Sequence, residues 1–348
     1  MITFRQEEIL KYIKEKGSTS NREIRDFVVG KYGDISRHTI IRDIDSLRNM
    51  GLIESSGKGR SVVYELSAES KLSKNVDVEE YFKILPGQRK IKATFDFSIF
   101  GNLQNIILPI ELKELEKLNK KYQDNISNIS PTISKKEFER LTIELSWKSS
   151  HIEGNTYNLL ETEQLIKERI EAKGHTREEA IMILNHKEAL DFVRINKGQY
   201  KDLSMRKIED VHYLLTKEMG ISRNMRKGQV GITGTGYRPL DNEFQIKEAL
   251  EKTCIAVDGA KDVYSKALLL NLLIAYIQPF EDGNKRTSRL MGNAVLMAYD
   301  ACPLSFRSID ELEYKKAIIL FYEQNNLKYF KELFIEQFKF AVENYFRN

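Results

Sequence analysis

A long apolar run in the second half of the chain, Ala267 to Ile277, places the strongest constraint on the fold. It is about half as long as the ~20 residues that a bilayer-spanning helix needs, and Asn271 interrupts it. The run therefore predicts a buried helix of a globular protein with no membrane partner, and Pro279 ends that helix. Helical patterns dominate the chain after residue 109, so we expect a mainly α fold.

The expected helices cover about 110–124, 134–153, 158–172, 177–197, 204–219, 244–258, 261–277, 284–300, 309–323 and 328–346. One glycine-rich stretch, Gly228 to Pro239, breaks this pattern and predicts a β-hairpin. Because a lone hairpin is marginal in water, we expect it to lean on the helices and to move.

The first 66 residues predict a separate compact unit. Helical patterns begin near Phe4, behind Ser20 and after Ser36, and the third one ends at Gly51. Two short β-rich runs then surround a turn at 56–59, which is a hairpin signal. Three helices followed by a hairpin are the layout of a winged helix-turn-helix domain. After it, 67–108 predict a linker and packing segment, and 109–348 a helical domain.

The stretch SRHTIIRDIDSLRNMGLI resembles the recognition helix of DeoR-type and related bacterial regulators. That resemblance implies DNA contacts by Arg37, His38, Thr39 and Arg42 on the helix and by Lys58 and Arg60 on the wing. Residues 1–66 hold 12 Lys/Arg and 10 Asp/Glu, a balance too even to require DNA. Protein contacts or dimerisation are the alternative role for this unit.

Charge and cysteine content select no partner by themselves. The net charge of +4 comes from 55 basic and 51 acidic residues, most of which lie on solvated faces. Cys254 and Cys302 provide neither a disulfide framework nor paired metal spacing. The N-terminus, MITFRQEEIL, is acidic and amphipathic and does not look like a secretory signal. These features predict a bacterial-type cytoplasmic protein.

The segment AYIQPFEDGNKRTSRLMGN, which follows the apolar run, has the residue types of a phosphate site. Phe280 anchors the loop, Gly283 permits close backbone approach, and the next helix offers unpaired N–H groups to an anion. Arg286 and Arg289 project from one helical side, and forked guanidinium groups suit phosphate oxygens. Asp282 is a hard oxygen ligand of the kind Mg²⁺ prefers. The combination predicts a metal–polyphosphate ligand; the alternative is a capped helix with an Asp–Arg surface pair.

QPFEDGNKRTSR is similar to the signature of the Fic family, His-x-Phe-x-Asp/Glu-Gly-Asn-Gly-Arg-x-x-Arg. Members of that family transfer AMP, and occasionally another phosphate-containing group, from a nucleotide to a protein hydroxyl. Upstream, SSHIEGN resembles the inhibitory pattern of the family, and GQVGITGTGYRPL stands where the family has its target-aligning flap. The resemblance covers about residues 80–340 and implies a Fic-type helical bundle with a β-hairpin flap.

The resemblance also implies roles for individual residues. Asp282 binds Mg²⁺, Arg286 holds the β-phosphate of ATP and Arg289 the γ-phosphate. The other nucleotide-binding positions are Gly283, Asn284 and Lys285. The inhibitory residues are Ser149, Glu153 and Gly154, on a helix at about 134–155, where Glu153 reaches Arg289. The flap, about 228–240, docks the target through Gly231, Ile232, Thr233 and Gly234.

Two positions depart from the Fic signature. Gln278 stands where the family has its catalytic histidine, and glutamine cannot accept a proton at neutral pH. Loss of a general base costs ~10²–10⁴-fold in rate, so activity is expected to be weak or lost. Lys285 replaces the second glycine, as in Doc-like relatives, which phosphorylate their target.

Four functions are compatible with the sequence. The first is an adenylyltransferase restrained by Glu153, which uses ATP and Mg²⁺ on a Ser, Thr or Tyr hydroxyl of a protein. The second is a DNA-binding regulator whose Fic-like domain senses nucleotide, and the third is a Doc-like phosphotransferase. The fourth is a catalytically dead scaffold. A homodimer is a further expected assembly.

Overall fold

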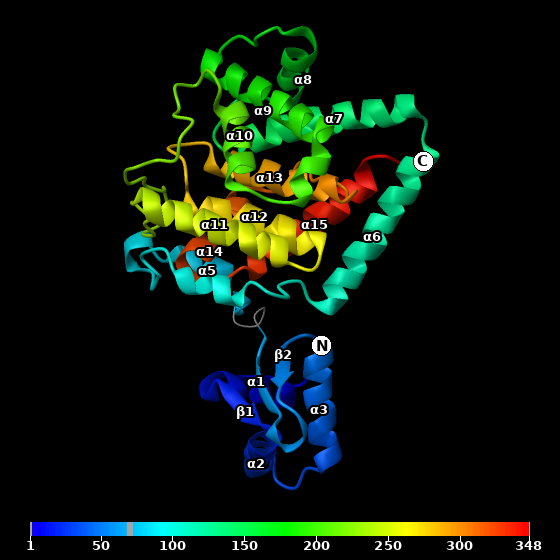
Figure 1. Ribbon diagram of the computed structural model, residues 1–348, viewed down its shortest axis with the longest axis vertical. Coiled ribbons are helices and arrows are strands. Elements are labelled where there is room, and N and C mark those ends of the chain that lie inside the picture. The colour runs from blue at the N-terminus through cyan, green and yellow to red at the C-terminus, as the bar shows by residue number, and fades with distance from the viewer. Residues whose placement is uncertain (1, 68–71, 348) are drawn as a thin grey trace. The chain divides into compact units, whose positions relative to one another are not determined.

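The computed structural model describes residues 2–67 and 72–347, and the chain divides into two compact units (Figure 1). The first unit comprises Met1–Lys74 and Gly101–Glu114, and the second comprises Asn75–Phe100 and Leu115–Asn348. The predicted linker, 67–108, therefore contributes to both units, and its residues 68–71 lie outside the described residues. The domain boundaries at 66 and 108 stay a prediction.

The first unit combines three helices with a small sheet. Its elements are α1 (Phe4–Lys16), β1 (Ser18–Ser20), α2 (Asn21–Tyr32), α3 (Arg37–Asn49), β2 (Ile53–Ser56) and β3 (Val63–Leu66). The sheet is antiparallel in the order β1-β3-β2, with Ser18 opposite Glu65 and Ile53 opposite Leu66. Strand β1 was not expected from the sequence. The assignment of this unit to the winged helix-turn-helix class stays a prediction.

Capping side chains explain where the three helices of the first unit begin. The side chains of Thr3, Ser20 and Ser36 each accept a hydrogen bond from a backbone N–H in the first turn. The helices and β-strands enclose one apolar core made of Ile9, Ile13, Ile24, Val28, Ile40, Ile44, Leu47, Ile53 and Tyr64. This unit therefore buries its own hydrophobic residues.

The second unit is built from helices. They are α5 (Val78–Lys83), α6 (Pro109–Asn128, which begins in the first unit), α7 (Pro131–His151), α8 (Leu159–Glu168), α9 (Arg177–Ile195), α10 (Met205–Thr216), α11 (Glu243–Gly259), α12 (Val263–Ile277), α13 (Asn284–Ala298), α14 (Glu311–Gln324) and α15 (Lys328–Asn344). Short 3₁₀ turns occur at Pro86–Gln88, Phe97–Asn102 and Lys197–Lys201. No described helix combines the length and the hydropathy that crossing a membrane requires.

Helix α12 is the centre of the second unit, as its apolar sequence predicts. Every residue from Tyr264 to Ile277 is buried. Helices α11 and α14 pack on α12, while α7, α9 and α10 pack on its partner α13 (Figure 1). A Cβ at Gly292 of α13 would lie 2.2 Å from the amide nitrogen of Asn271, so the close approach of α13 to α12 requires glycine here. Asn271 itself donates to the carbonyl of Ala267, which explains the polar interruption of the run.

The glycine-rich stretch 228–240 is not a β-hairpin, which corrects the expectation from the sequence. It contains no strand, and its one ladder contact is a parallel bridge between Arg238 and Thr94. Its backbone is bonded by side chains instead of a facing strand: Arg89 donates to the carbonyl of Gly234, and the hydroxyl of Thr235 accepts from the N–H of Tyr237. Glycines also weaken a strand. We call residues 228–240 the flap loop.

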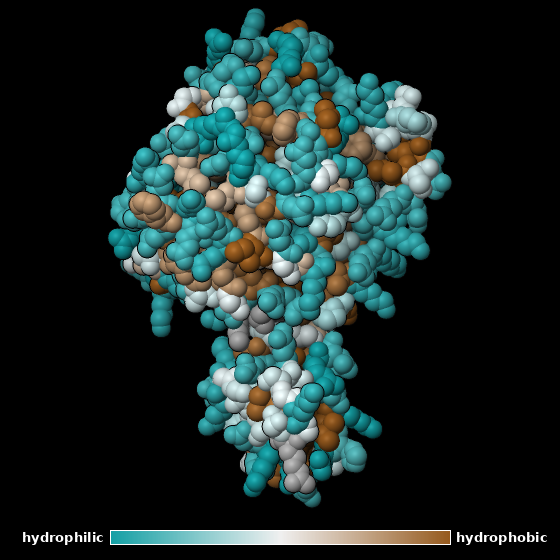
Figure 2. All heavy atoms as spheres, in the orientation of Figure 1, coloured by the Kyte–Doolittle hydropathy of each residue, from teal (hydrophilic) through white to brown (hydrophobic). Residues whose placement is uncertain are grey.

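On the face shown in Figure 2, hydrophilic side chains surround scattered hydrophobic ones. Among the exposed large hydrophobic residues of the second unit, Phe244 and Ile255 lie toward opposite ends of α11, and Leu312 lies on α14. The homodimer stays a prediction.

Candidate active site

The site is a loop between α12 and α13, and a distant arginine holds its first residues. Gln278 ends α12 in the left-handed conformation (φ 50°, ψ 61°). The guanidinium of Arg226 donates to the carbonyl oxygens of Gln278 at 2.6 Å and Ile277 at 3.3 Å. Carbonyl groups at a helix end lack partners within the helix, so Arg226 satisfies them. Sequence reasoning missed Arg226, because no local pattern reveals a contact over 52 residues.

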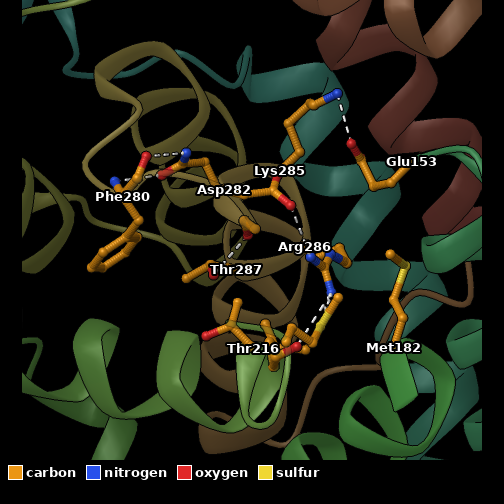
Figure 3. Close-up of polar contacts among 12 residues, drawn as sticks. Glu153, Met182, Thr216, Phe280, Asp282, Lys285, Arg286 and Thr287 are labelled. Carbon is orange, nitrogen blue, oxygen red and sulfur yellow. Dashed lines mark hydrogen bonds and ion pairs between the residues drawn. The ribbon is translucent and has the colours of Figure 1, made fainter. Parts of the chain in front are cut away.

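The middle of the loop is folded around the side chain of Asn284. Its carbonyl oxygen accepts from the N–H of Phe280 at 2.9 Å, and its amide nitrogen donates to the carbonyl of Phe280 at 2.8 Å. The same amide nitrogen donates to Gln278 Oε1 at 2.9 Å. Figure 3 shows the contacts with Phe280. Asn284 therefore fixes the path of the chain into α13.

Gly283 occupies the position before α13 with φ of 77° and no capping side chain. A Cβ there would lie 2.8 Å from Cγ2 of Thr216, so both conformation and space require glycine. Because Gly283 has no side chain, it cannot accept a hydrogen bond from the N–H groups of the first turn of α13, as a capping residue would. A helix start of this kind binds an anion through its N–H groups and its dipole.

Phe280 anchors the loop, as expected, and its partner is His212. The two rings stack with centroids 3.7 Å apart and planes 7° apart. His212 Nε2 donates to the carbonyl of Asp282 at 3.0 Å. Burial lowers the pKa of His212 to about 4, so the ring is neutral at physiological pH. Its neutral state leaves the positive charge of this site to arginine and lysine.

Arg286 is buried and incompletely paired (Figure 3). It donates to the carbonyl of Leu215 at 3.2 Å, and its Nη2 lies 3.5 Å from Asp282 Oδ2. Its Nε has no hydrogen-bond partner among the described residues. With Arg286 only 1% exposed and Asp282 69% exposed, this contact is not a surface ion pair. A buried guanidinium with an unused donor is suited to an anion that enters from outside.

Arg289 is also buried, but its donors are occupied. It donates to the hydroxyl of Ser149 at 3.0 Å, to the carbonyl of Ser149 at 2.8 Å and to the hydroxyl of Tyr314 at 3.2 Å. Its Nη2 donates to Glu153 Oε1 at 2.9 Å. Helix α7 ends at His151, so Ser149 lies on its last turn and Glu153 just beyond it. Sequence reasoning missed Tyr314, which lies on α14.

Glu153 is held by two cations. One carboxylate oxygen meets Arg289, and the other lies 2.7 Å from Nζ of Lys285 (Figure 3). Burial raises the pKa of Glu153, but the charges and hydrogen bonds of Arg289 and Lys285 outweigh it and bring the pKa down to about 2. Glu153 is therefore a carboxylate at physiological pH, placed beside the start of α13.

The amide of Gln278 is buried and turned into the protein. Its nitrogen donates to the carbonyl of Ala275 at 2.7 Å and to the hydroxyl of Tyr322 at 3.4 Å, while its oxygen accepts from Asn284. Burial raises the pKa of Tyr322 well above its ordinary value, so that hydroxyl remains protonated. Neither Gln278 nor Tyr322 accepts a proton here.

Comparison with known proteins agrees with this geometry. Residues 202–296 match the model of the Fic/DOC family. This segment is a Fic/DOC family domain. The protein adenylyltransferase Fic of Nematostella vectensis is 28% identical over 176 residues, which cover 48% of this chain and 40% of the relative. The protein of the same name from Aedes aegypti is 26% identical over 204 residues, which cover 55% of this chain and 40% of the relative. The chain thus matches two fifths of these relatives.

Solved structures show the same fold. Fic-1 from C. elegans superimposes with a TM-score of 0.56 at 18% identity, over 68% of this chain and 71% of that one. A Fic domain-containing signaling protein from Bacteroides thetaiotaomicron superimposes with a TM-score of 0.56 at 18% identity, over 66% and 94% of the two chains. The helical body around the Fic domain is therefore the Fic fold.

Two histidines near the Fic domain do not replace the missing histidine. Burial, with the charges of Arg289 and Arg286, lowers the pKa of His186 to about 3, and its Nδ1 lies 3.3 Å from the hydroxyl of Ser146. His151 donates to the carbonyl of Asn155 at 2.7 Å and lies 3.2 Å from Glu311. In the described part of the chain, neither ring is hydrogen-bonded or ion-paired to a residue of the 278–289 loop.

A magnesium ion would use Asp282. The described residues contain no group of three or more His, Cys, Asp or Glu side chains that could hold a metal. Mg²⁺ is commonly bound through one or two carboxylates together with substrate phosphates, and the exposed carboxylate of Asp282 fits that mode.

The remaining predicted residues are placed as follows. Gly154 follows Glu153 with φ of 98°. The flap-loop residues Gly231, Thr233 and Gly234 are exposed and Ile232 is partly exposed. Of the residues predicted to meet DNA, Arg37, His38, Arg42 and Lys58 are exposed and Thr39 is partly exposed. The side chain of Arg60 lies outside the described part of the structure.

Proposed function

We propose that this chain is a Fic-type protein adenylyltransferase, held inactive by Glu153 and slow because of Gln278. The observation that carries the proposal is the carboxylate of Glu153 between Arg289 and Lys285 at the start of α13. An anion already occupies the cationic end of the site. The curated relatives are named as adenylyltransferases, which favours AMP transfer over other phosphate chemistry.

In the proposed reaction, ATP is the donor and a protein hydroxyl is the acceptor. The phosphates bind the N–H groups at the start of α13, with Arg286 and Arg289 as guanidinium donors. Mg²⁺ at Asp282 would neutralise part of their charge. The hydroxyl oxygen attacks the α-phosphorus, the bond to the bridging oxygen breaks, and pyrophosphate leaves. Removal of Glu153 from Arg289 must come first, since one guanidinium cannot serve both anions.

The proton of the acceptor hydroxyl has no base to receive it. Gln278 stands at the family's histidine position, and its amide is bonded to Ala275, Asn284 and Tyr322. Positioning and electrostatic stabilisation remain, so transfer continues at a rate ~10²–10⁴-fold below that with a general base.

Labelled ATP tests the proposal. Purified Glu153→Gly protein is incubated with Mg²⁺ and either α-labelled or γ-labelled ATP, with Glu153→Gly/Gln278→His alongside. We expect protein-bound label from the α-position only, more of it with histidine at 278. Label from the γ-position only would instead assign the Doc-like phosphotransferase reaction. Glu171→Gly, which removes an exposed loop carboxylate of the same unit, is the control and should behave like the parent.

A second candidate function belongs to the first unit. Arg37, His38 and Arg42 are exposed at the start of α3, where a recognition helix presents its side chains to a major groove. We propose that this unit binds DNA. Through it, the chain would repress its own operon or bring the Fic domain to that site. A mobility-shift series against the upstream region of the coding sequence tests it. Binding should weaken with salt and be lost in Arg37→Ala/Arg42→Ala, but not in Lys14→Ala, an exposed lysine on α1.

A further inference from the structure

We propose that Arg89 and Glu323, a buried ion pair, position the flap loop. Both residues lie outside the segment that matches the family, which covers residues 202–296. Arg89 directly follows the 3₁₀ turn at Pro86–Gln88, and Glu323 lies on α14. The inference rests on the proposed function, because the flap loop docks a target only if the chain modifies a protein.

The pair touches the flap loop at two consecutive residues. Arg89 Nη1 donates to Glu323 Oε2 at 3.0 Å, and its Nη2 donates to the carbonyl of Gly234 at 2.6 Å. The hydroxyl of Thr235 donates to Glu323 Oε1 at 2.6 Å. The side chains of Arg89 and Glu323 are 2% and 0% exposed. Each of the two charged side chains thus makes one hydrogen bond to the flap loop and is buried away from water.

Neighbouring groups hold this pair in one geometry. The hydroxyl of Tyr81 also donates to Glu323 Oε2, at 2.7 Å. The guanidinium of Arg89 lies 5.6 Å and 5.0 Å from the ring centroids of Tyr81 and Phe82, within the range of a cation–π contact. Breaking one partner of such a pair leaves a buried charge uncompensated, so the two side chains act as a unit.

The other end of the flap loop is held by the arginine that caps α12. Arg226 Nη1 donates to the carbonyl of Gly228 at 2.6 Å. Between the two arginines, no hydrogen bond in the described part of the chain involves a backbone group of 230–233. These backbone groups are therefore available to pair with an extended target segment, as in strand addition. In this proposal, Arg89 and Glu323 fix the position of the unpaired backbone of 230–233 relative to α12 and α13.

A second ion pair, which joins α5 to α14, provides a matched control. Lys316 of α14 contacts Glu79 of α5, the helix that also carries Tyr81, but neither residue touches the flap loop. Glu79 is 71% exposed, so loss of its charge leaves no buried partner. Glu79→Gln therefore weakens the contact of α5 with α14 but leaves the Arg89–Glu323 pair and its contacts with the flap loop unchanged.

Nitroxide labels measure the position of the flap loop directly. Labels are attached to Ile232→Cys on the flap loop and Leu312→Cys on α14, since the native Cys254 and Cys302 are buried. The distance distribution between the labels is expected to be at least about twofold wider in Glu323→Gln and Arg89→Met, and unchanged in Glu79→Gln. An unchanged width in Glu323→Gln and Arg89→Met would overturn the proposal.

Thr235 supplies a milder test in case the buried charge variants fold poorly. Thr235→Val removes one hydroxyl at nearly constant size and should widen the distribution, whereas Thr235→Ser keeps the hydroxyl and should not. Distance distributions of equal width in these two variants would count against the positioning role of Arg89 and Glu323. ATP binding by calorimetry in the Glu153→Gly background should stay constant throughout. If that background binds no ATP while the widths change as expected, the proposed function fails and the positioning role stands.

Discussion

Nζ of Lys285 lies 2.7 Å from Glu153 Oε2, closer than the 2.9 Å between Glu153 Oε1 and Arg289. Lys285 stands where the Fic signature has its second glycine, so this chain adds a cation to the contact implied by the resemblance. Each carboxylate oxygen has its own positive partner. The proposed restraint by Glu153 would therefore depend on Lys285 and Arg289, which are four positions apart on α13 and lie on one helical face.

The two-cation arrangement predicts non-additive effects on stability. Lys285→Met and Glu153→Gln each remove one side of the 2.7 Å pair, in which the side chains are 30% and 15% exposed. In a double-mutant cycle, the free energies of unfolding should deviate from additivity by about 1 kcal/mol. Urea unfolding of the parent, both single variants and the double variant measures this. Strict additivity would show that Lys285 contributes nothing to holding Glu153.

The depressed pKa of Glu153 predicts how stability changes in acid. Its pKa is about 2 in the folded protein against an ordinary value of 4.5, so its ion pairs contribute fully above about pH 4.5. The contribution is lost as pH falls through about 2. The difference in unfolding free energy between the parent and Glu153→Gln should therefore be constant from neutral pH to about 5 and shrink below it. A difference that is flat down to pH 2.5 would contradict the assignment.

Restoring a histidine at 278 should raise the transfer rate. In the Glu153→Gly background, Gln278→His is expected to increase the rate of α-label incorporation by ~10²–10⁴-fold, because it supplies the general base. Gln278→Ala is the matched control: it also removes the bond from Asn284 but supplies no base, and it should give no increase. Equal rates for the histidine and alanine variants would mean that another group accepts the proton.

Several features of this site could be predicted from the sequence, because residues close together in the chain determine them. The apolar run predicts the buried α12, and the loop between Pro279 and Asn284 carries its own anchor and turn residues. The resemblance placed Glu153 against Arg289, and the structure has that contact; its inhibitory role stays a prediction. The contacts of Arg226 and Arg89, by contrast, join segments far apart in the chain. Periodicity carries no information about such pairs, and the same long-range bonds replace the ladder of the expected hairpin.

Arg226 should be needed for the loop and for stability. Arg226→Met removes the donors that satisfy the carbonyls of Ile277 and Gln278, and unpaired buried acceptors cost about 1–3 kcal/mol each. We expect a lower free energy of unfolding and weaker ATP binding in the Glu153→Gly background. Arg223→Met, an exposed arginine that pairs with Asp210, is the control and should change stability by less than about 0.5 kcal/mol.

Gly283 should tolerate no side chain, for two separable reasons. A side chain there would clash with Thr216, and the backbone has a left-handed conformation that disfavours residues other than glycine. Gly283→Ala introduces a Cβ at φ of 77°, 2.8 Å from the Thr216 methyl, and should destabilise the protein by about 1–3 kcal/mol. Thr216→Ser removes that methyl and keeps the hydroxyl that donates to the carbonyl of His212. The double variant should therefore recover the steric part of the loss and leave the conformational part, as measured by urea unfolding. Gly198→Ala, where φ is not in the left-handed region and no atom lies within 4 Å of the new Cβ, should be nearly neutral. If Gly283→Ala is equally neutral, the start of α13 is looser than the geometry requires, and its N–H groups are not fixed for a phosphate.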